Sequence, residues 1–272
     1  MIGSEVKLSI NGISDVGRVR DGNEDSISWD ARLGLIMLAD GMGGHNAGEV
    51  ASSLAVETIK AALQDVLAPE IQAADIIDYH DAVREAVAFA NQEIHEQAQM
   101  KPECAGMGTT VVMGLFRDDS VILAHVGDSR IYRYRHGELE QMTSDHSLVQ
   151  EMVDNGYLSK EEAQQSSSKN LITRALGIAP EVEVDVKQIP VQRDDIFLMC
   201  SDGLSDLVSD ADIARVIAEA GRDMQAATQG LVNLANERGG TDNVSVIIIS
   251  MTEAFSDERG LEPSTDNLAA PE

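Results

Sequence analysis

Residues 33–49 read LGLIMLADGMGGHNAGE and join a buried segment to a polar turn. The run at 33–39 is continuously apolar, which is typical of a strand covered on both faces. It ends at Asp40, and the glycine-rich turn 41–44 follows. Beyond this turn, apolar residues recur at helical spacing over 50–66 and predict an amphipathic helix. The stretch therefore places a carboxylate at the end of a buried strand, beside glycines that do not shield it.

The rest of the chain alternates between strand and helix patterns. Residues 110–116 and 121–126 predict two strands whose joint is too short for a crossover, so they pair antiparallel. A polar, serine-containing segment at 144–170 predicts an exposed flap. The pattern as a whole predicts an α+β fold with helices on the outer faces of antiparallel sheets. Its remaining elements are a helix around 83–94, strands at 131–135, 182–189, 195–200 and 243–250, and two helices within 210–236.

Composition narrows the class of partner. The 272 residues include 47 Asp+Glu against 20 Lys+Arg, a formal charge of −27, and 43% are hydrophobic. This predicts a globular core and a surface that repels nucleic acid and anionic lipid, so neither is expected as a partner. Divalent cations and basic protein segments suit such a surface better.

The cysteines and the two ends of the sequence predict the compartment. Cys104 and Cys200 are isolated, which is typical of reduced thiols, and we expect Cys200 to pack in the core. There is no pattern of a signal peptide or of a membrane span. We therefore expect a cytoplasmic monomer with one domain at 1–250 and an acidic, disordered tail at 251–272.

Acidic residues stand at the ends of four apolar segments, each beside a small residue: Asp40-Gly41, Gly127-Asp128, Asp202-Gly203 and Thr241-Asp242. Carboxylates and backbone carbonyls are hard ligands that suit Mg²⁺ or Mn²⁺, and no Cys or His pair has zinc spacing. Asp-Gly is also a common turn dipeptide. Spacing alone does not decide between four turns and one metal site.

Eight segments in order add a more specific signal. Together they resemble the PPM/PP2C family of metal-dependent Ser/Thr protein phosphatases, particularly its bacterial members. The segments are 15–26, 39–49 (ADGMGGHNAGE), 106–111 (GMGTTV), 127–132 (GDSRIY), 145–147 (DHS), 172–177 (ITRALG), 201–206 (SDGLSD) and 240–246 (GTDNVSV). They span about residues 10–250, nearly the whole chain.

The resemblance implies a central antiparallel β-sandwich flanked by pairs of helices. It implies that a water activated by a binuclear Mn²⁺ or Mg²⁺ centre hydrolyses phosphoserine and phosphothreonine in proteins. Asp40 would bridge the two ions and the Gly41 carbonyl would bind one of them. Asp202 and Asp242 would complete the pair. The partners implied are phosphorylated proteins, namely Ser/Thr kinases and their substrates.

Further roles follow from the same resemblance. Asp25 with Glu24 would hold coordinated waters or the edge of the metal site, and Asp128 with Asp206 would bind a third, weaker ion. Arg20 would bind the substrate phosphate, because its planar guanidinium matches the phosphate oxygens.

The sequence departs from eukaryotic members after the Asp-Gly pair, where it has Met42 in place of a histidine. His45 is then the nearest histidine. It is a candidate general acid, a candidate substrate contact, or only a residue at a helix start, and geometry must decide. We expect His146 to be structural and Arg130 and Arg174 to pair with carboxylates, with an approach to substrate as the alternative for Arg174.

Two other classes of function compete. A dinucleotide-binding turn would need a third glycine where Asn46 stands, and Asp40 would face the pyrophosphate. A catalytically weak phosphatase-like module that binds a phosphoprotein or regulatory partner would be expected to lack some of the metal-site acids, and all of them are present. Metal-dependent turnover distinguishes the enzyme from such a module.

Overall fold

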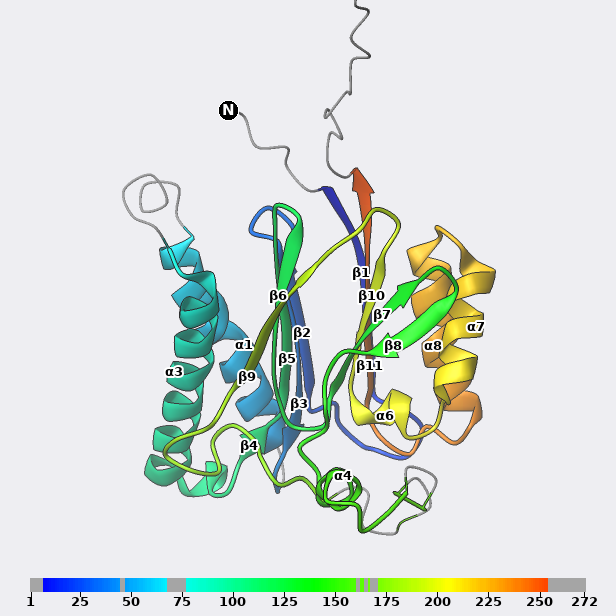
Figure 1. Ribbon diagram of the computed structural model, residues 1–272. Coiled ribbons are helices and arrows are strands. Elements are labelled where there is room, and N and C mark those ends of the chain that lie inside the picture. Colours follow the sequence, from blue (N-terminus) through cyan, green and yellow to red (C-terminus); the bar gives the residue numbers. More distant parts are fainter. Residues whose placement is uncertain are drawn as a thin grey trace, which may run out of the picture.

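The computed structural model describes residues 7–44, 47–67, 77–159, 162–163, 166 and 171–253. Its centre is a pair of antiparallel sheets (Figure 1). The first has the strand order β1 (Lys7–Asp15), β11 (Val244–Glu253), β10 (Ile196–Cys200), β7 (Arg130–Arg135) and β8 (Glu138–Gln141). The second has the order β2 (Asp25–Asp30), β3 (Leu35–Met42), β5 (Val111–Arg117), β6 (Ser120–Val126) and β9 (Asp185–Pro190), and β4 (Gly108–Thr109) pairs with β3.

Strand β3 shows why its sequence is apolar without interruption. Successive side chains of a strand point to opposite faces. Ile36 and Leu38 pack between the two sheets, against residues such as Phe197 of β10. Leu35 and Met37 point the other way and pack under helices. All four are fully buried, so the predicted coverage of both faces is confirmed.

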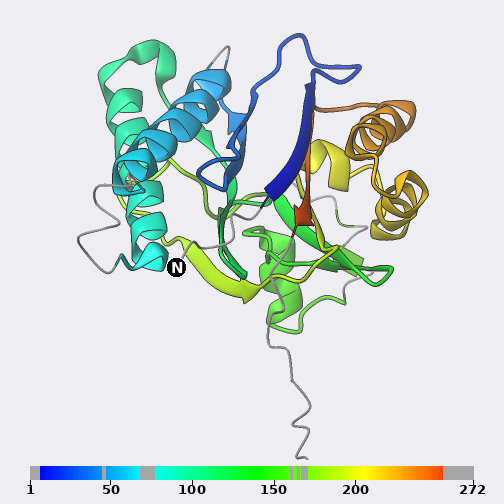
Figure 2. The same cartoon turned by 90° about the horizontal axis from the view of Figure 1, so that it is seen from above.

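Helices cover the outer face of each sheet (Figures 1 and 2). Helices α1 (Ala47–Val66) and α3 (Tyr79–Met100) pack on the second sheet, and α7 (Asp210–Ala220) and α8 (Met224–Glu237) cover the first. Side chains cap the starts of α3, α7 and α8, as at Asp78 before α3, because the first backbone N–H groups of a helix lack partners within it. The predicted α+β sandwich with flanking helix pairs is confirmed.

Three strands, β1, β2 and the two-residue β4, have no counterpart in the sequence prediction. Strand β1 pairs along its length with β11, and β2 pairs with β3. The segment of β1, KLSINGISD, alternates over 7–11 and changes phase at Gly12-Ile13, so its alternating stretch is short. Strand β11 also continues to Glu253, past the expected end at 250, because β1 pairs with it there.

The predicted flap is only partly within the described residues. It begins with α4 (Leu148–Asp154), and Ser147 pairs with Ile172 at its base. No helix of the described residues is long and apolar enough to cross a bilayer.

Candidate active site

Carboxylates from both sheets meet at one end of the sandwich. Asp40 lies near the end of β3 and stands directly opposite Asp25 in the β2–β3 ladder. Asp202 begins the short helix α6 (Asp202–Ser205) after β10, and Asp242 precedes β11. The Ser201 hydroxyl donates a hydrogen bond of 2.9 Å to Asp25 Oδ2 and so joins the two sheets at this end. The structure brings together the acids that the sequence analysis placed in the core of the metal site.

The cluster is electrostatically unfavourable without a cation. The pKa values of Asp40 and Asp202 are raised well above their ordinary range, first by burial and then by the neighbouring carboxylates. Burial raises the pKa of Asp25 to about 6. Carboxylates crowded in a poorly solvated site resist ionisation. A divalent cation at this position would supply the missing positive charge.

The donor set fits hard divalent ions. Within the described residues, Glu24 Oε1, Asp25 Oδ1 and Asp128 Oδ1 are buried and accept no hydrogen bond. Buried polar atoms are otherwise nearly always satisfied. Oxygen atoms with vacant lone pairs are the ligands that Mg²⁺ and Mn²⁺ prefer.

Glycines let the backbone approach this site closely. A Cβ atom on Gly41 would lie 2.1 Å from the carbonyl oxygen of Gly48, and one on Gly48 would lie 2.7 Å from Glu24 Oε1. The Gly41 N–H donates to the Glu24 carbonyl at 3.1 Å. The start of α1 therefore packs directly against the predicted ligand Gly41 and against Glu24.

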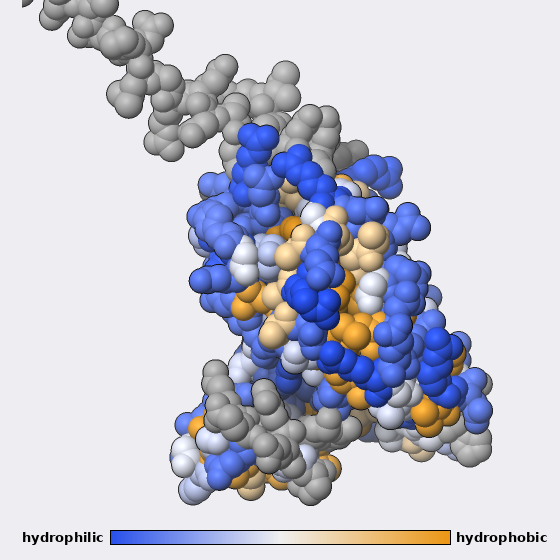
Figure 3. Space-filling view, turned by 90° about the vertical axis from the view of Figure 1, so that its right-hand side faces the viewer, coloured by the Kyte–Doolittle hydropathy of each residue, from blue (hydrophilic) through white to orange (hydrophobic). Residues whose placement is uncertain are grey.

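Asp128 and Asp206 lie near Asp202, and their charges contribute to the raised pKa of that carboxyl. Asp128 follows β6 and is buried, and Asp206 caps the C-terminal end of α6 through its N–H bond to the Asp202 carbonyl. All three acids line a cavity of about 650 Å³ whose other walls include residues of α4 and α7. In Figure 3 the molecular surface is hollowed between the larger upper part of the molecule and the smaller part below it.

Arg20 extends from the loop between β1 and β2. Its Nη2 donates to Asp242 Oδ2 at 2.7 Å, and half of its side chain is exposed. It therefore lies at the mouth of the acidic cluster, with one face to solvent. His45 lies outside the described residues, so its role stays a prediction.

The sequence matches a known family model over most of its length. Residues 18–236 match the model described as protein phosphatase 2C. The chain belongs to the protein phosphatase 2C family. The predicted family is confirmed, and with it the predicted class of enzyme, a protein phosphatase.

Curated and solved relatives agree. The serine/threonine phosphatase stp of Listeria innocua is 36% identical over 239 residues, which cover 87% of this chain and 93% of the relative. The crystal structure of the Mycobacterium tuberculosis phosphatase PstP superposes with a TM-score of 0.81 at 40% identity, covering 90% of this chain and 98% of that one. A structure of the PstP catalytic domain in complex with two manganese ions gives a TM-score of 0.78 at 39% identity, covering 90% and 99%.

Asn243 contacts the loop before β2 in this phosphatase, and the sequence analysis did not single it out. Its Nδ2 donates to the carbonyls of Val16 and Gly22, and its Oδ1 accepts from the Glu24 N–H at 2.8 Å. One amide thus shapes the loop that carries Arg20 and Glu24. The residue stood within the GTDNVSV segment, but only the folded chain shows what its amide contacts.

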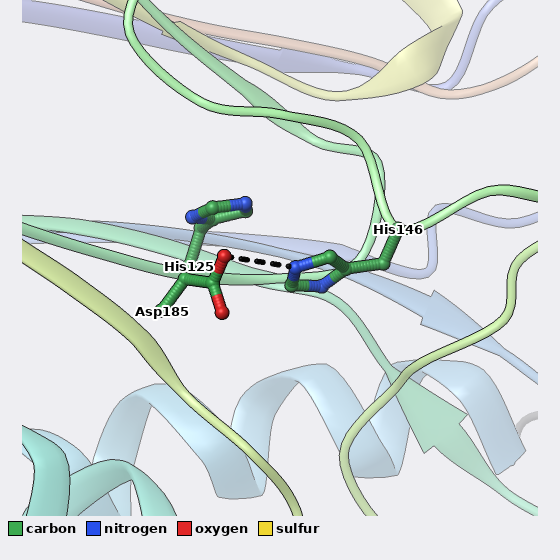
Figure 4. Close-up of side chains that lie close together, drawn as sticks. All are labelled: His125, His146 and Asp185. Carbon is green, nitrogen blue, oxygen red and sulfur yellow. Dashed lines mark ion pairs between the residues drawn. The ribbon is translucent and has the colours of Figure 1, made fainter. Parts of the chain in front are cut away.

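A second polar cluster lies at the base of the flap. His125, His146 and Asp185 each offer a ligand atom within 4.8 Å of the others (Figure 4). The two imidazole rings are stacked, with centroids 4.6 Å apart and an angle of 17° between their planes. A metal lies in the plane of each histidine that binds it, so nearly parallel stacked rings cannot share one. Arg174 already supplies a cation, 2.9 Å from Asp185 Oδ1.

The expected arginine pairings are confirmed. Arg130 forms a two-pronged pair with Asp145, with its shortest contact at 2.7 Å, and Arg174 pairs with Asp185 and Glu183. Cys200 is fully buried in the core, also as expected.

Proposed function

We propose that this chain hydrolyses phosphoserine and phosphothreonine in proteins, with two Mn²⁺ or Mg²⁺ ions held by Asp40, the Gly41 carbonyl, Asp202 and Asp242. The observation that carries the proposal is the convergence of carboxylates from both sheets on one point, where buried oxygens lack donors. The manganese complex of the similar PstP catalytic domain supports the choice of metal.

When bound, the cations would lower the pKa of water and neutralise the phosphoryl oxygens. The chain's own residues hold the metal site and bind the substrate phosphate. Asp25 and Glu24 offer oxygens at the edge of the core site. Arg20 binds the phosphate, because its guanidinium combines a fixed positive charge with several directed N–H donors. Its bond to Asp242 holds it beside the metal site.

We assign Asp128 and Asp206 to a third, more weakly bound ion. Both acids line the cavity next to Asp202, and burial followed by the charge of Asp145 raises the pKa of Asp128 to about 6. His45 stays a candidate for protonating the leaving oxygen or for contacting substrate.

The cellular setting is part of the proposal. The chain acts as a cytoplasmic monomer, and its catalytic domain is residues 1–250. It reverses the action of Ser/Thr kinases by dephosphorylating the kinases and their substrates. Membership of the protein phosphatase 2C family supports phosphorylated proteins as substrates. The net charge of −27 disfavours nucleic acid and membranes as partners. We assign the segment 144–170 to substrate selection, because several of its described residues line the cavity: Asp145, Ser147, Val149, Gln150, Val153 and Ala163.

The test is hydrolysis of a phosphothreonine peptide by the purified chain with Mn²⁺, with Mg²⁺ and with excess EDTA. We expect turnover with either metal and none with EDTA. A folded chain that shows no turnover with any metal would favour the binding-module alternative. Turnover that persists in EDTA would overturn the metal-dependent mechanism.

A further inference from the structure

His146 lies where the two ends of the flap meet. We call residues 144–148 and 171–174 the flap base. The His146 carbonyl accepts from the Thr173 N–H at 2.8 Å, and Leu148 N donates to the Leu171 carbonyl at 2.9 Å. Together with the Ser147–Ile172 bridge, these bonds join the two ends of the flap.

The same residue holds Gly127 through two hydrogen bonds. The Gly127 N–H donates to His146 Nδ1 at 3.0 Å, and the His146 N–H donates to the Gly127 carbonyl at 2.9 Å. Gly127 has φ = 107°, and a Cβ there would lie 2.6 Å from Thr110 Cγ2. The backbone immediately before Asp128 is therefore confined by Thr110 on one side and bonded to His146 on another.

The His146 ring is fixed in the orientation that this bond needs. Nδ1 accepts from the Gly127 N–H, while Nε2 lies 3.0 Å from Arg174 Nη1 and 3.4 Å from Asp185 Oδ2. Burial, then His125 and Arg174, lowers the pKa of His146 to about 4, so the ring is neutral near pH 7. His125 stacks on the ring, and its Nε2 bonds the Ser144 carbonyl at 2.9 Å.

The backbone after Asp128 is tied to the core metal site. The Ser129 and Thr110 hydroxyls share a hydrogen bond of 2.7 Å. The Thr110 N–H donates to the Asp40 carbonyl at 2.9 Å, and the Asp40 N–H donates to Thr110 Oγ1 at 3.1 Å. Both neighbours of Asp128 are therefore held: Gly127 by His146 of the flap base, and Ser129 through Thr110 by Asp40 of β3.

We propose that His146 is a positioning residue for the third divalent cation: its Nδ1 fixes the Gly127 amide and thereby aims the carboxylate of Asp128 into the cavity that Asp206 also lines. The inference rests on the proposed function. Asp128 is only 7% exposed, its Oδ1 accepts no hydrogen bond from the described residues, and it lines that cavity. Residues that orient a metal ligand without touching the metal affect its affinity strongly.

Asparagine and glutamine at position 146 separate the two ring nitrogens. The Oδ1 of His146→Asn can occupy the place of Nδ1 and accept from Gly127. The longer His146→Gln places its amide near the position of Nε2, so it keeps a contact with Asp185 and loses the acceptor for Gly127. Both variants are polar and smaller than histidine, so each controls for the loss of ring packing in the other.

The measurement is calorimetric titration of Mn²⁺ into the metal-free full chain, with the thermal unfolding midpoint recorded for each variant. We expect the parent to bind two ions tightly and a third weakly. His146→Gln should weaken the third ion by about tenfold and leave the tight ions unchanged. His146→Asn should bind the third ion as the parent does.

Four outcomes would overturn the inference. A fall in unfolding midpoint for His146→Gln with unchanged affinity for the third ion would show a merely structural role. Equal weakening in the Asn and Gln variants would show that the Nδ1 acceptor is not the cause. A parent chain that binds only two ions would remove the third site but leave the proposed function intact, whereas a parent that binds none would overturn both.

Discussion

Arg20 and Asp242 lie 222 positions apart in the sequence, yet Arg20 Nη2 donates to Asp242 Oδ2 at 2.7 Å. Half of the arginine side chain and about a third of the aspartate are exposed, at 50% and 32%. Such exposed pairs stabilise a fold little. The pair therefore matters for orientation, because it holds a guanidinium beside a proposed metal ligand at the mouth of the site.

Arg20→Lys should weaken substrate binding without destabilising the fold. Lysine keeps the charge but lacks the planar fork, so we expect KM for a phosphopeptide to rise by about tenfold. The unfolding midpoint should not change. Steady-state kinetics with Arg32→Lys as the control check this, because Arg32 is 92% exposed and lies outside the site. An unchanged KM would contradict the role of Arg20.

Asp202→Asn should abolish turnover while the chain remains folded. The substitution keeps the volume but removes an anionic ligand, and turnover should fall by at least about 100-fold because several kcal/mol of metal stabilisation are lost. The metal-free variant should be at least as stable as the parent, since it has one fewer buried charge. Asp65→Asn, an exposed change on α1, is the control. Activity retained after chelation and remetallation would refute the assignment of Asp202.

Stabilisation by Mn²⁺ should increase with pH. The pKa values of Asp25 and Asp128 are about 6 in the fold against an ordinary value of 3.8. Groups with raised pKa values stabilise the fold below the unfolded value, and this contribution is lost as pH rises through about 6. The metal-free chain thus loses stability over this range, and bound cations offset the loss. Unfolding midpoints with and without Mn²⁺ at about pH 5 and about pH 7.5 check this. An equal increment at both pH values would contradict it.

Gly48→Ala should impair the site although alanine favours the helix. Gly48 is the second residue of α1, where alanine gains less than the roughly 1 kcal/mol by which it is favoured over glycine in a helix interior. Here its Cβ would lie 2.7 Å from Glu24 Oε1 and 2.8 Å from the carbonyl carbon of Gly41, so both must shift. We expect the Mn²⁺ concentration needed for half-maximal turnover to rise. Gly230→Ala in α8, where the nearest atom is 3.1 Å away on Val216, should leave it unchanged.

The sequence alone determined the class of fold and predicted which acids would form the core of the site. Periodicity marks buried strands and amphipathic helices because each residue's burial follows from local backbone geometry. The run at 33–39 therefore identified β3, and the apolar positions over 50–66 identified α1. Aspartates next to glycine at strand ends were compatible with turns or with a metal site, and the resemblance of eight segments in order to a known family favoured the metal site.

Only the tertiary structure decided which segments, far apart in the sequence, come into contact. Strand β1 forms because β11 pairs with it, and the alternating stretch of its own sequence is too short to predict a strand. The amide of Asn243 shapes the Arg20 loop, and His146 bonds Gly127, through contacts between segments far apart in the chain. Hydrogen bonds of this kind depend on distance and angle within a few tenths of an ångström. No local pattern encodes that geometry, because the packing of two sheets and four helices creates it.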